Sequence, residues 1–421
     1  MNQPEDYIGV LAPTKERGWR WLYTFRTLRH PNFRIFWFAQ ILSLTGNWMQ
    51  LVGQNWLVYR LTGSPLMLGA VGFVALIPVL PISLLGGVII DRTSKRWLLF
   101  LTQSALTMCA LGLGLLTWSG RVQVWHVIVV SFLMGAIGSV DLPARQIFVV
   151  DLVGKDDLMN AIALTTSIFN VARVVGPALA GLLVAWQGEA ICFFLNALSF
   201  MSLIVGLLFM RLPVPAAPAK MPSLTSGFVQ GFKYLLGQPV ILALMSIMVV
   251  SSFTVLPYQI LMPVFAQDVL DVGPRGLGFL MAAVGIGATA GALFVASLDA
   301  GQRGSFLTGG AVLLPLSVIA FCLSRRFLLA LIALVVVGAG TTWVQSMLNT
   351  LVQLNLQDDM RGRIMSLYLL LYVGMQQAGG LQASYIAELV GAPLSLGLGA
   401  VICLLYSLFV LWRLPFVRRL S

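Results

Sequence analysis

This chain of 421 residues is 58% hydrophobic and only 10% charged, whereas a soluble protein of its size carries roughly 25% charged residues. Apolar stretches of about 20 residues recur along nearly all of it, and each is long enough to cross the ~30 Å hydrocarbon core of a bilayer as a helix. The net charge of +11 is interpreted as membrane-topology signals rather than nucleic-acid binding. No sustained period-two alternation is present, which excludes a β-barrel. The sequence predicts an all-α polytopic membrane protein.

The residue types that carry most chemistry predict neither a catalytic nor a metal site. The four cysteines lie in apolar stretches without a close partner, as small buried side chains do. Neither His30 nor His126 has a nearby cluster of Cys, Asp or Glu, so a metal site is not expected. No phosphate-binding Gly-x-x-x-x-Gly-Lys-Ser/Thr stretch occurs, which argues against a primary pump, although an ATPase on a separate subunit stays open. We expect no enzymatic activity and no cofactor.

Twelve membrane-spanning helices are predicted in chain order. They cover residues 34–59, 66–90, 97–118, 124–147, 159–185, 189–210, 239–265, 275–297, 305–324, 327–350, 363–387 and 393–412. The longest polar break begins with a proline-rich stretch that cannot continue a helix. We therefore expect a cytoplasmic N-terminal segment (1–33), two six-helix bundles (34–210 and 239–412), a cytoplasmic linker (211–238) and a cytoplasmic tail (413–421).

The cations and an internal repeat set the expected topology. With both termini in the cytoplasm, 20 of the 26 lysines and arginines fall on the cytoplasmic side, five on the other, and Arg173 lies within a span. Pro65 and Pro274 open spans two and eight at an interval of 209 residues, and the Asp-Asp pairs before spans five and eleven are 202 residues apart. Two six-helix repeats of parallel orientation are typical of transporters.

A short basic turn, residues 87–96, joins spans two and three. Gly87 permits close helix packing, and Asp91 lies where it can accept a hydrogen bond from a neighbouring helix. We expect Arg92 to pair with Asp141 of span four, so that the turn forms part of a cytoplasmic latch. The alternative is that Arg92, Lys95 and Arg96 only anchor the topology.

These residues carry a resemblance to a known family. The pattern Gly87-x-x-x-Asp91-Arg92-x-x-Lys95-Arg96 resembles motif A of the major facilitator superfamily, with Ser94 where that motif usually has glycine. Gly176-Pro177-x-x-x-Gly181 in span five resembles motif C of its antiporter branch. Further segments are similar to the enterobactin-exporter-like branch: Asn32-Phe33-Arg34, Asp141-x-Pro143-x-Arg145-Gln146, Asn170-x-Ala-Arg173 and Arg361-Gly362-Arg363. The resemblance implies the twelve-helix fold, alternating access, and export of small molecules in exchange for protons.

Charged residues within spans are the candidates for gating and proton coupling. Arg173 lies midway along span five, where a cation costs at least ~2.5–3.5 kcal/mol, so it needs a partner or a wet cavity. We expect Asp141, Arg145 and Arg173 to form one cluster with Arg92, either as a gate or as a purely structural ion-pair network. Span one lacks the acidic residue common in drug antiporters, so Asp141 is the predicted proton-coupling group.

In folds of this type, spans one, four, seven and ten line the central cavity. Its expected lining combines amide and aromatic side chains: Asn47, Gln50, Gln54, Tyr258, Gln259, Gln345 and Asn349, with Gln376 from span eleven. Such a cavity suits a neutral or amphiphilic cargo. The alternative is that these amides bridge neighbouring helices.

The sequence therefore predicts a secondary active exporter of a small siderophore- or drug-like molecule, driven by a proton gradient. The alternatives are an uptake symporter of the same fold and an integral membrane enzyme, for which no nucleophile–base pair is evident. We expect a monomer in the cell inner membrane with the bilayer and a small molecule as its partners.

Overall fold

The computed structural model describes residues 25–79, 81–83, 89–90, 93–210, 231–298 and 303–414 of the chain. This part is nearly all helical and contains no strand, which confirms the all-α prediction. In chain order the elements are η1 (Arg26–Arg29), α2 (Pro31–Thr62), α3 (Pro65–Leu76), α5 (Lys95–Trp118), α6 (Val124–Val153), α7 (Leu158–Gln187), α8 (Ala190–Phe209), α10 (Pro239–Thr254), α11 (Tyr258–Val264), the π-helical turn η2 (Phe265–Val269), α12 (Gly273–Ala296), α13 (Arg303–Leu323), α14 (Phe327–Leu354), α15 (Asp358–Val390) and α16 (Ala392–Arg413).

Among the described residues, eleven segments are long and apolar enough to cross a membrane. The twelfth expected span, α2, has 32 residues but is more polar, because it carries amide side chains such as Gln40, Asn47, Gln50 and Gln54. Polar groups inside a bilayer are costly unless they face the protein interior. The amides of α2 therefore mark a helix whose contacts lie within the protein.

Proline and glycine set the ends of several helices. Pro31, Pro65 and Pro239 stand at first helical positions, where the missing amide hydrogen costs nothing. Gly63 ends α2 with a φ of 60°, a left-handed conformation that glycine adopts without strain. This is why α2 and α3 are joined by only two residues.

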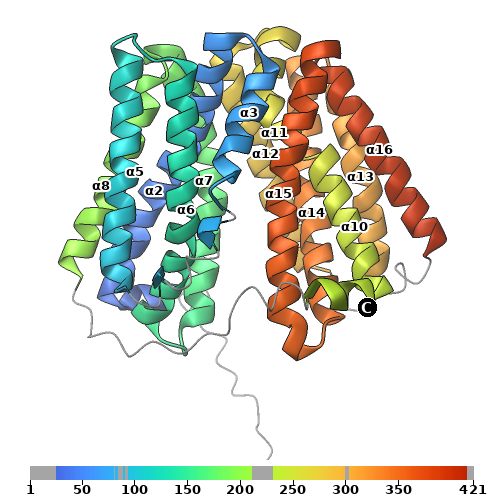
Figure 1. Ribbon diagram of the computed structural model, residues 1–421, viewed down its shortest axis with the longest axis horizontal. Helices are drawn as coiled ribbons and strands as arrows, with labels where there is room; N and C mark the ends of the chain where they lie inside the picture. The colour runs from blue at the N-terminus through green and yellow to red at the C-terminus, as the bar shows by residue number, and fades with distance from the viewer. Residues whose placement is uncertain are drawn as a thin grey trace, which may run out of the picture.

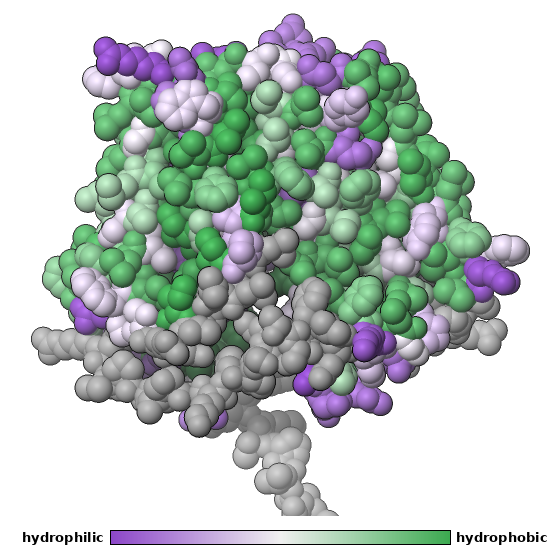
Figure 2. Space-filling view, in the orientation of Figure 1, coloured by the Kyte–Doolittle hydropathy of each residue, from purple (hydrophilic) through white to green (hydrophobic). Residues whose placement is uncertain are grey.

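The helices form two bundles side by side, one from α2–α8 and one from α10–α16 (Figure 1). We name the edge where α2 begins and α16 ends the terminal end, and the opposite edge, where α2 meets α3, the far end. Apolar residues cover the middle of the visible face, and hydrophilic residues gather along its upper and lower edges (Figure 2). This distribution suits a protein that spans a bilayer.

The two bundles meet through two helix crossings that repeat each other. A Cβ added at Gly278 of α12 would lie 2.6 Å from the Pro177 carbonyl oxygen and 2.8 Å from Gly181 Cα of α7. A Cβ added at Gly69 of α3 would lie 2.7 Å from Ser384 Cβ of α15. Gly69 and Gly278 are separated by the 209-residue repeat interval, so the same close contact is made twice.

Span seven is interrupted, which the sequence analysis did not anticipate. Helix α10 ends at Thr254, a turn follows at Val255–Pro257, and α11 resumes at Tyr258 before the π-helical turn η2. Proline lacks the amide hydrogen that a continuous helix would use. A broken helix near mid-span is tolerated where its backbone lies inside the protein, and such breaks are typical of transporter binding sites.

Candidate functional site

The basic turn is only partly within the described residues. Gly87, Asp91 and Arg92 lie outside them, so the expected pairing of Arg92 with Asp141 stays a prediction. Ser94 caps α5, with its Oγ accepting from the Trp97 amide at 3.4 Å, which gives this departure from motif A a local role. Lys95 begins α5, and Arg96 Nη2 donates to the Leu208 carbonyl oxygen at 3.2 Å, satisfying a backbone acceptor in the last turn of α8.

Asp141 is the centre of a buried polar network within the first bundle. Its carboxylate accepts hydrogen bonds from Arg145 Nε at 2.6 Å, Thr102 Oγ1 at 2.6 Å and Gln103 Nε2 at 2.8 Å. Asp141 and Arg145 are each only 6% exposed, and Arg145 Nη2 reaches Ser43 Oγ at 3.5 Å. The network therefore joins α2, α5 and α6.

Arg173 does not join this network, contrary to the expected cluster. Its guanidinium carbon lies 6.0 Å from the centre of the Trp48 ring, and it lines a pocket with residues of the second bundle. Asp141 and Arg145 instead satisfy one another inside the first bundle. The sequence could place all three residues within spans, but it does not show that α7 turns Arg173 towards the interface between the bundles.

The motif C residues lie at two helix crossings. A Cβ at Gly176 would lie 2.5 Å from Trp48 Cβ of α2, and a Cβ at Gly181 would lie 2.7 Å from Gly278 Cα of α12. Pro177 stands within α7, which is helical from Leu158 to Gln187. The absence of side chains at both glycines lets α7 approach α2 on one side and the second bundle on the other.

The amides of α2 bridge helices inside the first bundle. Gln50 Oε1 accepts from Asn196 Nδ2 of α8 at 2.6 Å, and the same nitrogen lies 3.4 Å from Asn47 Oδ1. Gln54 Nε2 donates to Ser131 Oγ of α6 at 3.0 Å. Gln50 is only 2% exposed. In this conformation the three amides therefore bridge helices, which was the alternative to lining the cavity. Their contact with cargo in another conformation stays a prediction.

The cavity-lining residues expected from the second bundle lie in two regions, on α14 and α15 and on α11. Gln345 Oε1 accepts from the Tyr368 hydroxyl at 3.2 Å, and Asn349 Oδ1 accepts from Gln353 at 2.6 Å. Gln376 is half-buried on α15. Tyr258 and Gln259, by contrast, lie together directly after the break in span seven.

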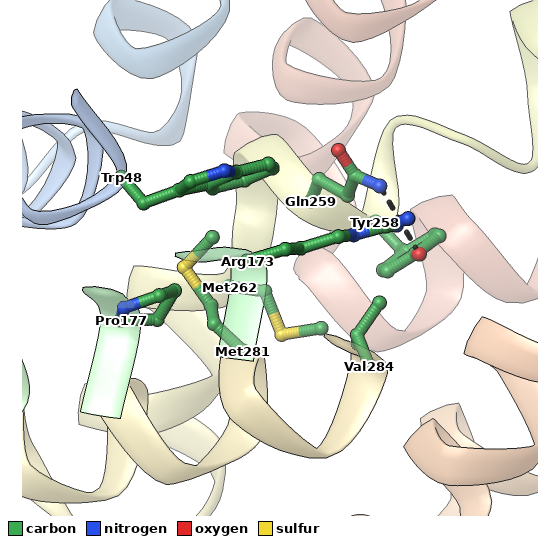
Figure 3. A pocket seen from close by; sticks show the side chains of 8 residues that line it. All are labelled: Trp48, Arg173, Pro177, Tyr258, Gln259, Met262, Met281 and Val284. Carbon is green, nitrogen blue, oxygen red and sulfur yellow. Dashed lines mark hydrogen bonds between the residues drawn. The ribbon is translucent and has the colours of Figure 1, made fainter. Parts of the chain in front are cut away.

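A pocket between the bundles collects Arg173, Tyr258 and Gln259 (Figure 3). It is lined by Trp48 of α2, Arg173 and Pro177 of α7, Tyr258, Gln259 and Met262 of α11, and Met281 and Val284 of α12. The Arg173 side chain runs past the Trp48 ring towards Tyr258, and Gln259 Nε2 donates to the Tyr258 hydroxyl at 3.2 Å. Four helices from both bundles thus enclose one cation, two polar groups, aromatic rings and two thioethers.

Polar contacts that the sequence does not indicate join the two bundles at the far end. The Tyr59 hydroxyl donates to Asp268 Oδ2, and Glu388 Oε2 accepts from Ser64 Oγ at 2.7 Å and from the Leu66 amide at 3.1 Å. The Glu388 carboxylate thereby caps the N-terminus of α3 from the other bundle. The sequence places these acids near span ends but does not show partners more than 200 residues away.

A carboxylate cluster fixes the start of α2 at the terminal end. Asp157, 4% exposed, accepts hydrogen bonds from Arg29 Nη2 at 3.0 Å and His30 Nε2 at 2.8 Å, and it forms an ion pair with Arg26 Nε at 3.0 Å. The hydrogen bond from His30, aided by Arg29 and Arg26, holds the pKa of the Asp157 carboxyl below its ordinary value. The Thr27 backbone amide also donates a hydrogen bond to Asn160 Oδ1 at 3.3 Å, so η1 is docked onto the start of α7.

The sequence profile of the transmembrane secretion effector family matches residues 23–419, nearly the whole chain. The chain belongs to this family of the major facilitator superfamily. It is therefore a multi-pass membrane transporter, in agreement with the resemblance found in its motifs.

Named relatives share about a quarter of its residues. The chain is 26% identical to the staphyloferrin A transporter of Staphylococcus aureus, over 85% of this chain and 90% of that protein. The same identity links it to the multidrug efflux pump Tap of Mycolicibacterium fortuitum (83% and 90% covered) and to the enterobactin exporter EntS of Salmonella paratyphi A (95% and 97% covered).

Solved structures share the fold at low sequence identity. A bacterial homologue of the lysosomal transporter Spinster, inward-facing and occupied, matches with a TM-score of 0.73 at 12% identity over 93% of this chain and 98% of that one. A POT family transporter in complex with a thioalcohol-conjugated peptide matches with a TM-score of 0.72 at 12% identity over 91% of this chain and 96% of that one. These matches confirm the twelve-helix transporter fold.

Proposed function

We propose that the protein is a secondary active exporter that moves a small siderophore- or drug-like molecule out of the cell by alternating access. The observation that carries this proposal is the pocket between the bundles, which lies directly beside the crossing of α7 and α12 at Pro177. Separation of the bundles at this crossing would expose the pocket to the far end. Two bundles that rock about a central site are how such repeats transport.

Two observations support the proposed direction of transport. The excess of cations in the sequence segments expected on the cytoplasmic side favours a cytoplasmic location for both chain ends in the cell inner membrane. The described conformation, joined at the far end, then faces inward. The names of the relatives include an exporter and an efflux pump, which favours outward movement over uptake.

Proton exchange is the proposed energy source, with Asp141 as the coupling group, no cofactor, and a monomer as the working unit. Asp141 supports this role because it is buried on α6 and paired with Arg145, so a change in its protonation would alter the α2–α5–α6 network. Measuring proton flux in proteoliposomes with Asp141→Asn tests the assignment. Unchanged coupling in that variant would discard it.

Everted membrane vesicles test the exporter proposal. We expect respiration-driven accumulation of amphiphilic probes inside vesicles that contain the protein, abolished by a protonophore and absent from vesicles without the protein. Accumulation only in right-side-out vesicles would instead support an uptake symporter. No gradient-dependent movement of any probe in a broad panel would reject secondary transport.

A further inference from the structure

The pocket holds one cation, Arg173, that has no acidic partner among the described residues. Arg173 is the sixteenth of the 30 residues of α7, so it lies at mid-membrane depth. A guanidinium does not escape its desolvation by losing a proton. Within the described part of the chain, no carboxylate forms an ion pair with it, since Asp141 is held by Arg145 and Asp268 by Tyr59.

The contact that Arg173 does make is a weak substitute for a carboxylate. The Trp48 ring stabilises the guanidinium through its π-face at 6.0 Å, which leaves the N–H groups of the guanidinium without a counter-charge. A guanidinium presents five N–H donors in a planar fork that fits two carboxylate oxygens. The site therefore retains unused capacity for an anion.

The rest of the lining suits an anion with an apolar or aromatic body. The Tyr258 hydroxyl and the Gln259 amide add neutral hydrogen-bonding groups beside the guanidinium, and neither group brings a competing negative charge. Trp48 offers a ring for stacking, and Met262 and Met281 are adaptable, polarizable apolar groups. A site with one cation, two polar groups and an apolar wall is complementary to an amphiphilic anion.

The space is contracted in the described conformation. The free volume among these side chains is about 10 Å³, enough for about one water. A Cβ added at Gly285 of α12 would lie 2.8 Å from the Arg173 carbonyl oxygen, so the second bundle presses directly on this turn of α7. Separation of the bundles would therefore enlarge the pocket around Arg173.

We propose that Arg173 is the anion-binding residue of the cargo site and that the cargo is a small organic carboxylate with an aromatic or apolar body. The carboxylate binds the guanidinium fork, and the body lies against Trp48 and the two methionines. This inference rests on the proposed transport function and narrows its substrate, since a neutral cargo would leave the guanidinium uncompensated.

Matched pairs of probes test the charge preference. The purified full chain would be titrated with 1-naphthoate and 1-naphthamide, and with salicylate and salicylamide, and binding measured by the shift in thermal midpoint. We expect each carboxylate to bind at least about tenfold more tightly than its amide, because a charge-assisted hydrogen bond contributes about 1.5–3 kcal/mol.

Variants assign that preference to one residue. Arg173→Gln should weaken carboxylate binding about 10- to 100-fold and leave amide binding unchanged, while Arg173→Lys, which keeps the charge but loses the fork, should be intermediate. Arg325→Gln, at an exposed arginine between α13 and α14, is the matched control and should bind as the wild type does. Equal binding of both members of each pair, no binding of either, or an unchanged preference in Arg173→Gln would overturn the proposal.

Transport of the same probes in proteoliposomes separates this inference from the exporter proposal. Carboxylate binding that depends on Arg173, without movement under any gradient, would support the anion site and reject transport of these probes. Gradient-driven movement of carboxylates and amides alike, unaffected by Arg173→Gln, would support transport and reject the anion site.

Discussion

The Tyr59 hydroxyl donates a hydrogen bond to Asp268 of the other bundle, and the two residues are 209 positions apart, the interval that also separates Pro65 from Pro274. They therefore occupy equivalent places in the two repeats. Equivalent residues meet only near the axis that relates the repeats. The bond thus ties the bundles together at the far end, close to that axis.

We expect Tyr59→Phe to favour opening of the far end. The variant removes one hydrogen bond to a charged group, worth about 1.5–3 kcal/mol when buried and less at this partly exposed position. Spin labels at positions 121 and 325, in the far-end loops of the two bundles, should report a larger fraction of long distances. Tyr385→Phe, at an exposed tyrosine of α15, is the matched control; the same distribution in both variants would contradict a tie at Tyr59.

Gly278→Val should prevent the far end from closing. Its Cβ would lie 2.6 Å from the Pro177 carbonyl oxygen, which is backbone and cannot move aside without shifting α7. Overpacking of this kind costs about 1–3 kcal/mol, enough to reduce the closed population about 5- to 150-fold. Transport should fall accordingly while expression and helical content persist. Gly397→Val on α16, where a Cβ would meet nothing within 4 Å, should transport normally.

Features of this molecule that depend on neighbouring residues along the chain can be predicted from the sequence, whereas features that depend on contacts between distant helices cannot. The span limits follow from local hydropathy, so α7 and α14 begin within one residue of their expected starts. The rotation of each helix about its axis is set by tertiary packing, and for that reason Arg173 was assigned to the wrong cluster. The partners of Asp268 and Glu388 come from the other bundle and leave no local signal.

Two further features leave a signal in the sequence. Pro257, in the middle of an apolar stretch, indicated the break that brings Tyr258 and Gln259 to the pocket. The amides of α2 were assigned to a cavity because they are polar, yet Gln50 and Gln54 bond α8 and α6. Polarity alone does not distinguish an amide that faces cargo from one that bridges helices, since both lie inside the protein.

Asp141→Asn should destabilise the first bundle, because it leaves Arg145 as a buried cation without its carboxylate. Breaking a buried ion pair costs about 3–5 kcal/mol. The double variant Asp141→Asn/Arg145→Gln removes both charges and should be more stable than Asp141→Asn alone. Thermal unfolding of the purified variants measures this, and a double variant less stable than either single variant would contradict the expected coupling.

The segment η1 should stay docked on α7 across the physiological pH range. Because the folded pKa of Asp157 lies below its ordinary value of 3.8, its stabilising contribution is complete above pH 3.8 and is lost only as the pH falls through the lower, folded pKa. Arg26 and Arg29 stay charged throughout, and the His30 ring can donate through Nε2–H in either protonation state. A spin label at position 25 should therefore show the same mobility from pH 8 to pH 5.

Asp157→Asn should release this segment at neutral pH, since it removes the charge that three side chains share. Limited trypsinolysis followed by mass spectrometry should then detect faster cleavage after Arg26 and Arg29. Asp156→Asn is the matched control, because Asp156 is the exposed neighbour of Asp157. Equal cleavage rates in the two variants would show that Thr27 and Asn160, rather than the carboxylate, hold η1 on the start of α7.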